Sequence, residues 1–177
     1  MRQVLASLLG SSAAALRFVR GEHGKPRLAG DAAHAGLAFN LSHSGPWALL
    51  GWSWHADIGV DIELWRTVSD EAALVRRFFS VAENAAYDAL PAARRQRGFF
   101  DCWARKEAYI KAVGQGLALP LDSFDVSFAD DEPARLLRCS AVLQDARCWA
   151  LAAVDVGPEA SAAVVLEGDA CHILPAN

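Results

Sequence analysis

The sequence predicts an α+β fold of two lobes related by a pseudo-two-fold axis, each an antiparallel sheet with packed helices. Any active site is expected at the lobe interface. The 177 residues are 53% hydrophobic and 21% charged, which is enough for a substantial core. Short apolar segments flank a helix-rich middle. The tripeptide Trp-Ala-Leu at 47–49 recurs at 149–151, and Val-Asp-Ile-Glu at 60–63 resembles Val-Val-Leu-Glu at 164–167. Segments this short can match by chance, whereas a duplicated lobe would predict a pseudo-two-fold fold.

The N-terminal segment is expected to form a helix, a strand and a loop. Apolar side chains recur at helical spacing in residues 4–9, and Gly10 offers a C-terminal stop, which favours a helix over a signal peptide. Residues 16–20 alternate like a strand. Residues 21–26 contain two glycines and a proline and are therefore expected to form a turn and loop.

Strands are expected to dominate the rest of the first lobe. Residues 37–41, 47–54 and 58–63 are short and apolar, as strands of a small sheet are. The polar segments 42–46 and 55–57 separate them. This arrangement fits antiparallel pairing.

The middle of the chain is expected to be helical. Residues 69–113 are rich in Ala, Leu, Arg and Glu and should form two or three helices, the longest over about 94–113. Ser69 and Ser80 are the expected N-caps, the second in a capping box with Glu83. Strands are expected again at 124–128, 136–139, 148–154 and 162–166.

The change in character divides the chain into a first lobe, residues 1–68, and a second lobe, residues 69–177. A cleft between two lobes is a common place for a ligand to bind.

Charge is distributed unevenly between the middle and the rest of the chain. Residues 76–111 hold eight basic and four acidic side chains, although the whole chain has a net charge of −4. The segment is either a docking surface for an anionic partner or an ordinary solvated helix face. The overall negative charge makes nucleic acid a weak candidate partner. The eight basic residues of this segment are Arg76, Arg77, Arg94, Arg95, Arg97, Arg105, Lys106 and Lys111.

Cysteine spacing and hydropathy indicate a cytoplasmic protein. The four cysteines, Cys102, Cys139, Cys148 and Cys171, have neither zinc-type spacing nor the density of a disulfide scaffold, so reduced thiols are expected. Charged residues interrupt the longest apolar stretch before the ~18 residues that a membrane span needs. No membrane partner is expected.

Asp61 and Glu63 are candidate functional carboxylates. They are two residues apart on a predicted strand, so both leave the same face, about 6–7 Å apart. A solvent-facing edge strand is the simpler interpretation of such a pair. The flanking Ile58, Val60 and Ile62 favour a functional role, because they would anchor the opposite face in a core.

Glu107 and Lys111 are four residues apart on the long helix and share a face with Trp103. A surface ion pair worth roughly 0.3–0.5 kcal/mol would explain them equally well. Together with Asp61 and Glu63, however, they give three carboxylates and a cation. Magnesium prefers a few carboxylates and waters and leaves positions for phosphate oxygens, so this set suits phosphate chemistry.

Three stretches match one family in order and spacing. They are Gly24-Lys25-Pro26 followed by Phe39-Asn40-Leu41-Ser42-His43-Ser44, then Gly59-Val60-Asp61-Ile62-Glu63, then Trp103-Ala104-Arg105-Lys106-Glu107-Ala108-Tyr109-Ile110-Lys111-Ala112-Val113-Gly114. In these stretches the chain resembles the 4'-phosphopantetheinyl transferases, specifically the two-lobed, surfactin-synthetase-activating type. The segment from Phe78 to Glu83 also resembles the corresponding segment of this family.

The resemblance implies a magnesium site and two catalytic residues. Asp61, Glu63 and Glu107 would hold Mg²⁺, directly or through water, with the coenzyme A diphosphate completing the shell. Lys111 would lie beside the reacting phosphate. Glu107, Lys111 or a metal-linked water would take the serine proton.

The resemblance also implies a nucleotide site. Lys25, Ser42 and His43 match positions that contact the phosphates of coenzyme A, the co-substrate. His43 could instead be a turn histidine with satisfied hydrogen bonds. Trp103 could be a core residue, and Lys106 could serve the docking surface.

The activity implied is transfer of 4'-phosphopantetheine from coenzyme A to a serine of an apo acyl, peptidyl or aryl carrier protein, with 3',5'-ADP leaving. The protein would act as a monomer in secondary metabolism or fatty-acid biosynthesis.

Two alternatives to an active transferase stay open, namely a homologue without turnover and a metal nuclease. Members of this type usually carry about forty more residues before the first helix, so the chain is expected to be trimmed, to have a misassigned start or to lack part of its first lobe. In the last case it could be an impaired homologue that binds coenzyme A or carrier protein without turnover. A metal nuclease is disfavoured by the negative net charge.

Overall fold

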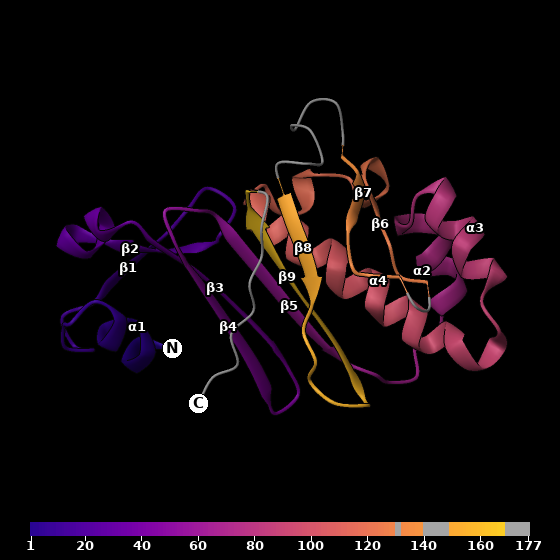
Figure 1. The fold of residues 1–177 in the computed structure, drawn as a ribbon, viewed down its shortest axis with the longest axis horizontal. Helices are drawn as coiled ribbons and strands as arrows, with labels where there is room; N and C mark the ends of the chain where they lie inside the picture. Colours follow the sequence, from indigo (N-terminus) through magenta and orange to yellow (C-terminus); the bar gives the residue numbers. More distant parts are fainter. Residues whose placement is uncertain (130–131, 140–148, 169–177) are drawn as a thin grey trace.

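The first part of the chain consists of a small hairpin, a short helix and a longer strand pair. The structure is a computed structural model that describes residues 1–129, 132–139 and 149–168. The expected helix and first strand are confirmed. The expected loop ends earlier than predicted, because Pro26 begins a strand that pairs with the first one. The elements are α1 (Arg2–Leu8), β1 (Arg17–Arg20), β2 (Pro26–Ala29), the 3-10 helix η1 (Gly30–Ala35), β3 (Leu37–Ser44) and β4 (Trp47–Trp54) (Figure 1).

The antiparallel pair β3–β4 is longer than the sequence predicted. Its register runs from Leu37 opposite Trp54 to Ser44 opposite Trp47. The polar residues at 42–44 were expected to lie in a connection, but they complete β3, where each lies opposite a residue of β4 in the antiparallel register. Ser42 and His43 therefore lie on a strand, on opposite faces of the sheet.

A second sheet joins distant parts of the chain. β5 (Ile58–Leu64) pairs antiparallel with β9 (Ala160–Glu167), and β9 pairs with β8 (Trp149–Ala153). β5 thus lies before the predicted lobe boundary at residue 68 but belongs to a sheet of the C-terminal part. The lobe division itself stays a prediction.

The sequence recurrence has no counterpart in the strand pairing. β8 and β9, which contain the later copies, are hydrogen-bonded neighbours, whereas β4 pairs with β3 and β5 with β9. The fold class is nevertheless confirmed as α+β with antiparallel sheets.

Three helices follow β5 as predicted (Figure 1). The first begins one residue later than predicted: its N-cap is Asp70 rather than Ser69, and the Asp70 side chain makes no cap hydrogen bond. The capping box of Ser80 and Glu83 is confirmed. The helices are α2 (Glu71–Phe78), α3 (Val81–Ala89) and α4 (Ala92–Val113), after which come the 3-10 turns η2 (Gly116–Ala118) and η3 (Leu121–Ser123), β6 (Asp125–Val126) and β7 (Leu136–Arg138).

The long helix α4 lies directly against β5. A Cβ atom at Gly59 would lie 2.1 Å from the Ala108 carbonyl oxygen and 2.3 Å from the Ala112 nitrogen, closer than real atoms approach. The absence of a side chain at Gly59 therefore allows the backbones of helix and strand to touch. This contact brings the C-terminal half of α4 beside Asp61 and Glu63.

The two faces of β5 have different surroundings. Ile58, Val60 and Ile62 are each at most 5% exposed, and the first two pack in a cluster with side chains of β3 and β4. This confirms that they anchor one face in a core. The opposite face, which carries Asp61 and Glu63, is turned toward α4.

The largest hydrophobic core lies between α2, α3, α4 and the strands β6, β8 and β9. An ion pair is enclosed within it. Lys106 Nζ lies 2.7 Å from the carboxylate of Glu83, and the two side chains are 1% and 2% exposed. Glu83 also accepts hydrogen bonds from the backbone nitrogens of Ser80 and Val126, so the pair joins α3, α4 and β6.

The described residues bear on two further expectations, the absence of a membrane span and the reduced state of the cysteines. Among them no helix combines the length and apolar character needed to cross a bilayer. Cys102 is a buried free thiol. Cys148 and Cys171 lie outside the described residues.

Candidate active site

A pocket of about 370 Å³ opens where β3, β5 and α4 meet. Its lining contains every side chain that the sequence proposed as catalytic or metal-binding, together with two of the three proposed nucleotide contacts. Lys25 is the exception. The lining residues are Leu41, Ser42, His43, Asp61, Ile62, Glu63, Trp103, Glu107 and Lys111.

Asp61 lies at the centre of a polar cluster. It is 4% exposed, and its Oδ1 accepts hydrogen bonds from Lys111 Nζ at 2.6 Å and Ser42 Oγ at 2.7 Å. Lys111 Nζ also donates to Ser42 Oγ at 3.1 Å. Burial raises the pKa of Asp61 above its ordinary value, although Lys111 and Ser42 oppose this by stabilising the carboxylate.

Glu63 faces the same pocket but has a different partner. Its Oε2 accepts from Arg66 Nη1 at 2.9 Å and from Ser44 Oγ at 3.4 Å. Ser44 Oγ also accepts from the backbone nitrogen of Leu64 at 3.0 Å, which holds the end of β5 against β3.

Glu107 completes the set of carboxylates. Burial, followed by the nearby charge of Asp61, raises the pKa of Glu107, and Lys111 acts in the opposite direction. Within the described residues its carboxylate makes no hydrogen bond or ion pair. The group is thus a half-buried carboxylate that favours a proton or a cation.

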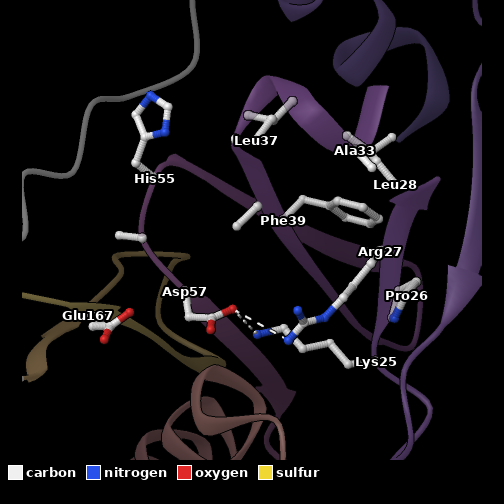
Figure 2. Close-up of a pocket in the computed structure, with 13 residues that line it drawn as sticks. Lys25, Pro26, Arg27, Leu28, Ala33, Leu37, Phe39, His55, Asp57 and Glu167 are labelled. Carbon is white, nitrogen blue, oxygen red and sulfur yellow. Dashed lines mark hydrogen bonds and ion pairs between the residues drawn. The ribbon is translucent and has the colours of Figure 1, made fainter. Parts of the chain in front are cut away.

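Lys25 lies in a second pocket of about 380 Å³ at the other end of β3 and β5 (Figure 2). Its Nζ lies 3.4 Å from Asp57 Oδ1 and donates to the Ala112 carbonyl at 3.1 Å. Arg27 Nη2 is 4.0 Å from the same Asp57 oxygen, and Phe39 forms part of the wall. Burial lowers the pKa of Lys25 despite the neighbouring Asp57. The structure therefore separates Lys25 from Ser42 and His43.

The residue types in the first pocket fit a hard divalent cation. The three carboxylates offer oxygen ligands, and Asp61 Oδ2 is buried without a hydrogen-bond partner. Two of the carboxylates are held in ion pairs, Asp61 with Lys111 and Glu63 with Arg66. Across residues 1–129, 132–139 and 149–168, no group of three or more His, Cys, Asp or Glu side chains is placed to hold a metal ion. Holding a cation with all three of these carboxylates would require them to move closer together.

Two residues of the helix motif have roles that the sequence left open. Trp103 both packs on the core, with its ring stacked on Phe99, and lines the pocket. Lys106 does not serve a docking surface, because it is buried with Glu83. Arg105 is also buried, at 7% exposure. The basic segment therefore presents fewer charges to solvent than its composition indicated.

Sequence reasoning missed three polar groups that organise the site. Arg66 and Ser44 both contact Glu63, and Asn40 Oδ1 accepts from the Val60 nitrogen at 2.9 Å, joining β3 to β5. Asn40, Ser42 and Ser44 alternate along one strand, and this period-two pattern of polar residues was the available signal.

Comparison with known proteins identifies the family. Residues 57–165 match the family model described as the 4'-phosphopantetheinyl transferase superfamily. This chain belongs to that superfamily. The 4'-phosphopantetheinyl transferase HetI of Nostoc is 36% identical over 168 residues, which cover 95% of this chain and 68% of HetI. The transferase Sfp of Bacillus subtilis is 39% identical over 117 residues, which cover 66% of this chain and 49% of Sfp.

Solved structures of two holo-(acyl-carrier-protein) synthases share the fold. The holo-(acyl-carrier-protein) synthase of Bacillus anthracis, solved in complex with CoA (3',5'-ADP), aligns with a TM-score of 0.52 at 21% identity, covering 64% of this chain and 96% of that one. The synthase of Thermotoga maritima aligns with a TM-score of 0.50 at 19% identity, covering 64% of each chain.

Proposed function

We propose that the protein transfers 4'-phosphopantetheine from coenzyme A to a serine of an apo carrier protein in a Mg²⁺-dependent reaction. The observation that carries the proposal is one pocket lined by three carboxylates, Ser42 and Lys111, in which Lys111 donates to both Asp61 and Ser42. Membership of the superfamily supports the reaction class. The chain spans about half the length of Sfp and 68% of HetI, so the activity is proposed for this chain rather than taken from those proteins.

The reaction consists of one displacement at phosphorus. The carrier serine oxygen attacks the phosphorus that bears pantetheine, the bond to the departing nucleotide breaks, and 3',5'-ADP takes the electron pair. The serine proton passes to a base in the pocket. Magnesium, when bound, neutralises charge on the phosphate oxygens.

Glu107 is the proposed base. Its pKa is raised by burial, and it makes no hydrogen bond or ion pair to another described side chain that would occupy it. A carboxylate with a raised pKa is a stronger base than an ordinary carboxylate, which suits it to accept the serine proton. Lys111 donates in both of its side-chain hydrogen bonds, so it supplies positive charge beside the phosphates.

Asp61, Glu63 and Glu107 are the proposed metal ligands, and Ser42 and His43 the proposed contacts to coenzyme A phosphates. Lys25 is proposed to contact the nucleotide from the neighbouring pocket, where Arg27 is a second cation. Apo acyl, peptidyl or aryl carrier proteins are the proposed partners. We also propose that the protein is a monomer that acts in the cytoplasm, in secondary metabolism or fatty-acid biosynthesis. Neither nucleic acid nor a membrane is a proposed partner.

The test is a mass measurement on an apo carrier protein incubated with the purified chain, coenzyme A and Mg²⁺. Addition of the phosphopantetheine mass, abolished by EDTA and restored by Mg²⁺, is the expected result. Absence of product with several carrier types would contradict the proposal.

The second candidate is a homologue that binds without turnover. It is favoured by one observation: among the described residues, the three pocket carboxylates are not placed together as a group that could hold a metal ion. Calorimetry separates the two candidates, because the second predicts binding of coenzyme A or carrier protein without formation of holo-carrier.

A further inference from the structure

Arg66 has contacts that tie it to the rim of the candidate active site. Its Nη1 donates to Glu63 Oε2 at 2.9 Å and to the Leu64 carbonyl at 3.3 Å. Its guanidinium lies over the ring of Phe100, 5.4 Å from the centroid. An arginine three residues after Glu63 thus folds back onto the carboxylate.

The pocket carboxylates differ in their counter-ions. Lys111 pairs with Asp61 and Arg66 pairs with Glu63, whereas Glu107 has no ion pair within the described part of the chain. Two basic side chains therefore balance charge that a bound cation would otherwise balance. This explains how carboxylates can face one pocket without being in position to hold a metal.

The two basic side chains differ in how easily they can leave. The side chain of Lys111 is 29% exposed and that of its partner Asp61 is 5% exposed, and the ammonium also donates to Ser42. Arg66 is 60% exposed, so its guanidinium can turn into water and exchange one solvated partner for another. Arg66 is the side chain whose release opens a ligand position at the smaller free-energy cost.

We propose that Arg66 is a displaceable counter-ion of Glu63 that competes with the divalent cation and so sets how tightly the cation is held. The inference rests on the proposed function, in which Glu63 is a metal ligand. A cation on the Glu63 carboxylate would be repelled by the guanidinium that now lies 2.9 Å from Oε2. The two equilibria are therefore coupled, and weakening the ion pair strengthens cation binding.

The experiment is calorimetric titration of the full chain with Mn²⁺ alone, for the wild type and for Arg66→Met. Methionine keeps an apolar side chain against Phe100 while removing the charge. An exposed ion pair is worth little, so tightening of the Mn²⁺ dissociation constant by roughly two- to five-fold is expected. Arg66→Lys keeps a positive charge and should fall between the two.

The matched control is Arg77→Met. Arg77 is also an exposed arginine whose guanidinium lies over a phenylalanine ring, 5.1 Å from the centroid of Phe78. It forms no ion pair with any residue of the described ranges. Arg77→Met should therefore leave Mn²⁺ binding at the wild-type value, although it removes the same charge from the whole protein.

A double-mutant cycle with Glu63→Gln localises the effect. In the Glu63→Gln background, Arg66→Met should produce no further tightening, because the pair that competes with the cation is already gone. The tightening of Mn²⁺ binding that Arg66→Met causes in the wild-type background should also become smaller at high salt. A gain that survives Glu63→Gln would overturn the inference and assign the effect to general electrostatics.

The remaining outcomes separate this inference from the proposed function. Mn²⁺ binding that is unchanged or weaker in Arg66→Met overturns the inference while leaving the metal site in place. Failure of both the wild type and Arg66→Met to bind Mn²⁺ overturns the inference and also removes the metal site of the free protein. Transfer activity, measured separately with coenzyme A present, then decides the proposed reaction.

Discussion

Lys111 Nζ lies 2.6 Å from Asp61 Oδ1, so the last turns of α4 are tied to the middle of β5. The partner Asp61 is 4% exposed and keeps its second oxygen without a hydrogen bond. One contact therefore joins the packing of a helix on a sheet to the candidate chemistry.

Replacing Asp61 with asparagine should remove activity while leaving the fold intact. The asparagine would keep the volume of the side chain but lose the charge that faces Lys111, so kcat/KM is expected to fall by roughly 10²–10³-fold. The measurement is the rate of holo-carrier formation, with circular dichroism as the check on folding. The control is Asp88→Asn, an exposed aspartate paired with Arg76, which should change the rate little. Wild-type rates for Asp61→Asn would remove Asp61 from the site.

Glu107→Gln should stabilise the unliganded protein although it inactivates it. Burial and Asp61 raise the folded-state pKa of Glu107 above its ordinary value. For a carboxyl group with a raised folded pKa, stability is highest below the unfolded pKa and falls as pH rises through the folded pKa. Glutamine stays neutral, so the Tm difference in favour of the variant should grow as the pH rises from about 4 to about 8. A wild type that is more stable than the variant at the upper end of this range would contradict the prediction.

Lys106→Met should be strongly destabilising, because it leaves Glu83 as a buried charge without its cation. Loss of one partner of a buried pair typically costs about 3–5 kcal/mol in the free energy of unfolding. Combining Lys106→Met with Glu83→Gln should cost less than the sum of the two single changes. Urea unfolding of the four proteins in this cycle is the measurement, and strict additivity would show that the pair is not coupled.

Gly59→Ala should separate α4 from β5. The added methyl group would meet backbone atoms of Ala108 and Ala112, which cannot rotate away, so about 1–3 kcal/mol of stability should be lost. Activity should fall as well, because the contact between Lys111 and Asp61 depends on this approach. The control is Gly21→Ala, where the nearest atom beyond the chain neighbours is 3.5 Å from the new Cβ and the φ is not in the left-handed region. Equal thermal stability of the two variants would contradict the packing argument.

Local patterns predicted much of the fold. The capping box at Ser80, the long helix and its C-terminal glycine depend on residues close in sequence, and they are confirmed. The strand β2 was missed because Pro26 indicated a loop, whereas the first residue of a strand can be proline. The pairing of β5 with β9 could not be predicted, because period-two patterns do not specify which strand is the neighbour.

Residue types and the family motif predicted which side chains form the candidate site. They did not predict which basic side chain pairs with which carboxylate. Spacing indicated that Asp61 and Glu63 share a face and that Glu107 and Lys111 share another, and the structure brings all four into one pocket. The partner of Glu63 depends on a local turn of the chain after β5, which spacing alone does not reveal.

The pairing of β5 with β9 also bears on how the protein is made. About a hundred residues separate the two strands, so β5 must wait for its neighbour until most of the described chain has left the ribosome. Until then the edge of β5 that pairs with β9 has no partner strand, although the residues that line the pocket, 41–111, have all been synthesised. The sheet that carries Asp61 and Glu63 is therefore completed only after the helices α2, α3 and α4 have been synthesised.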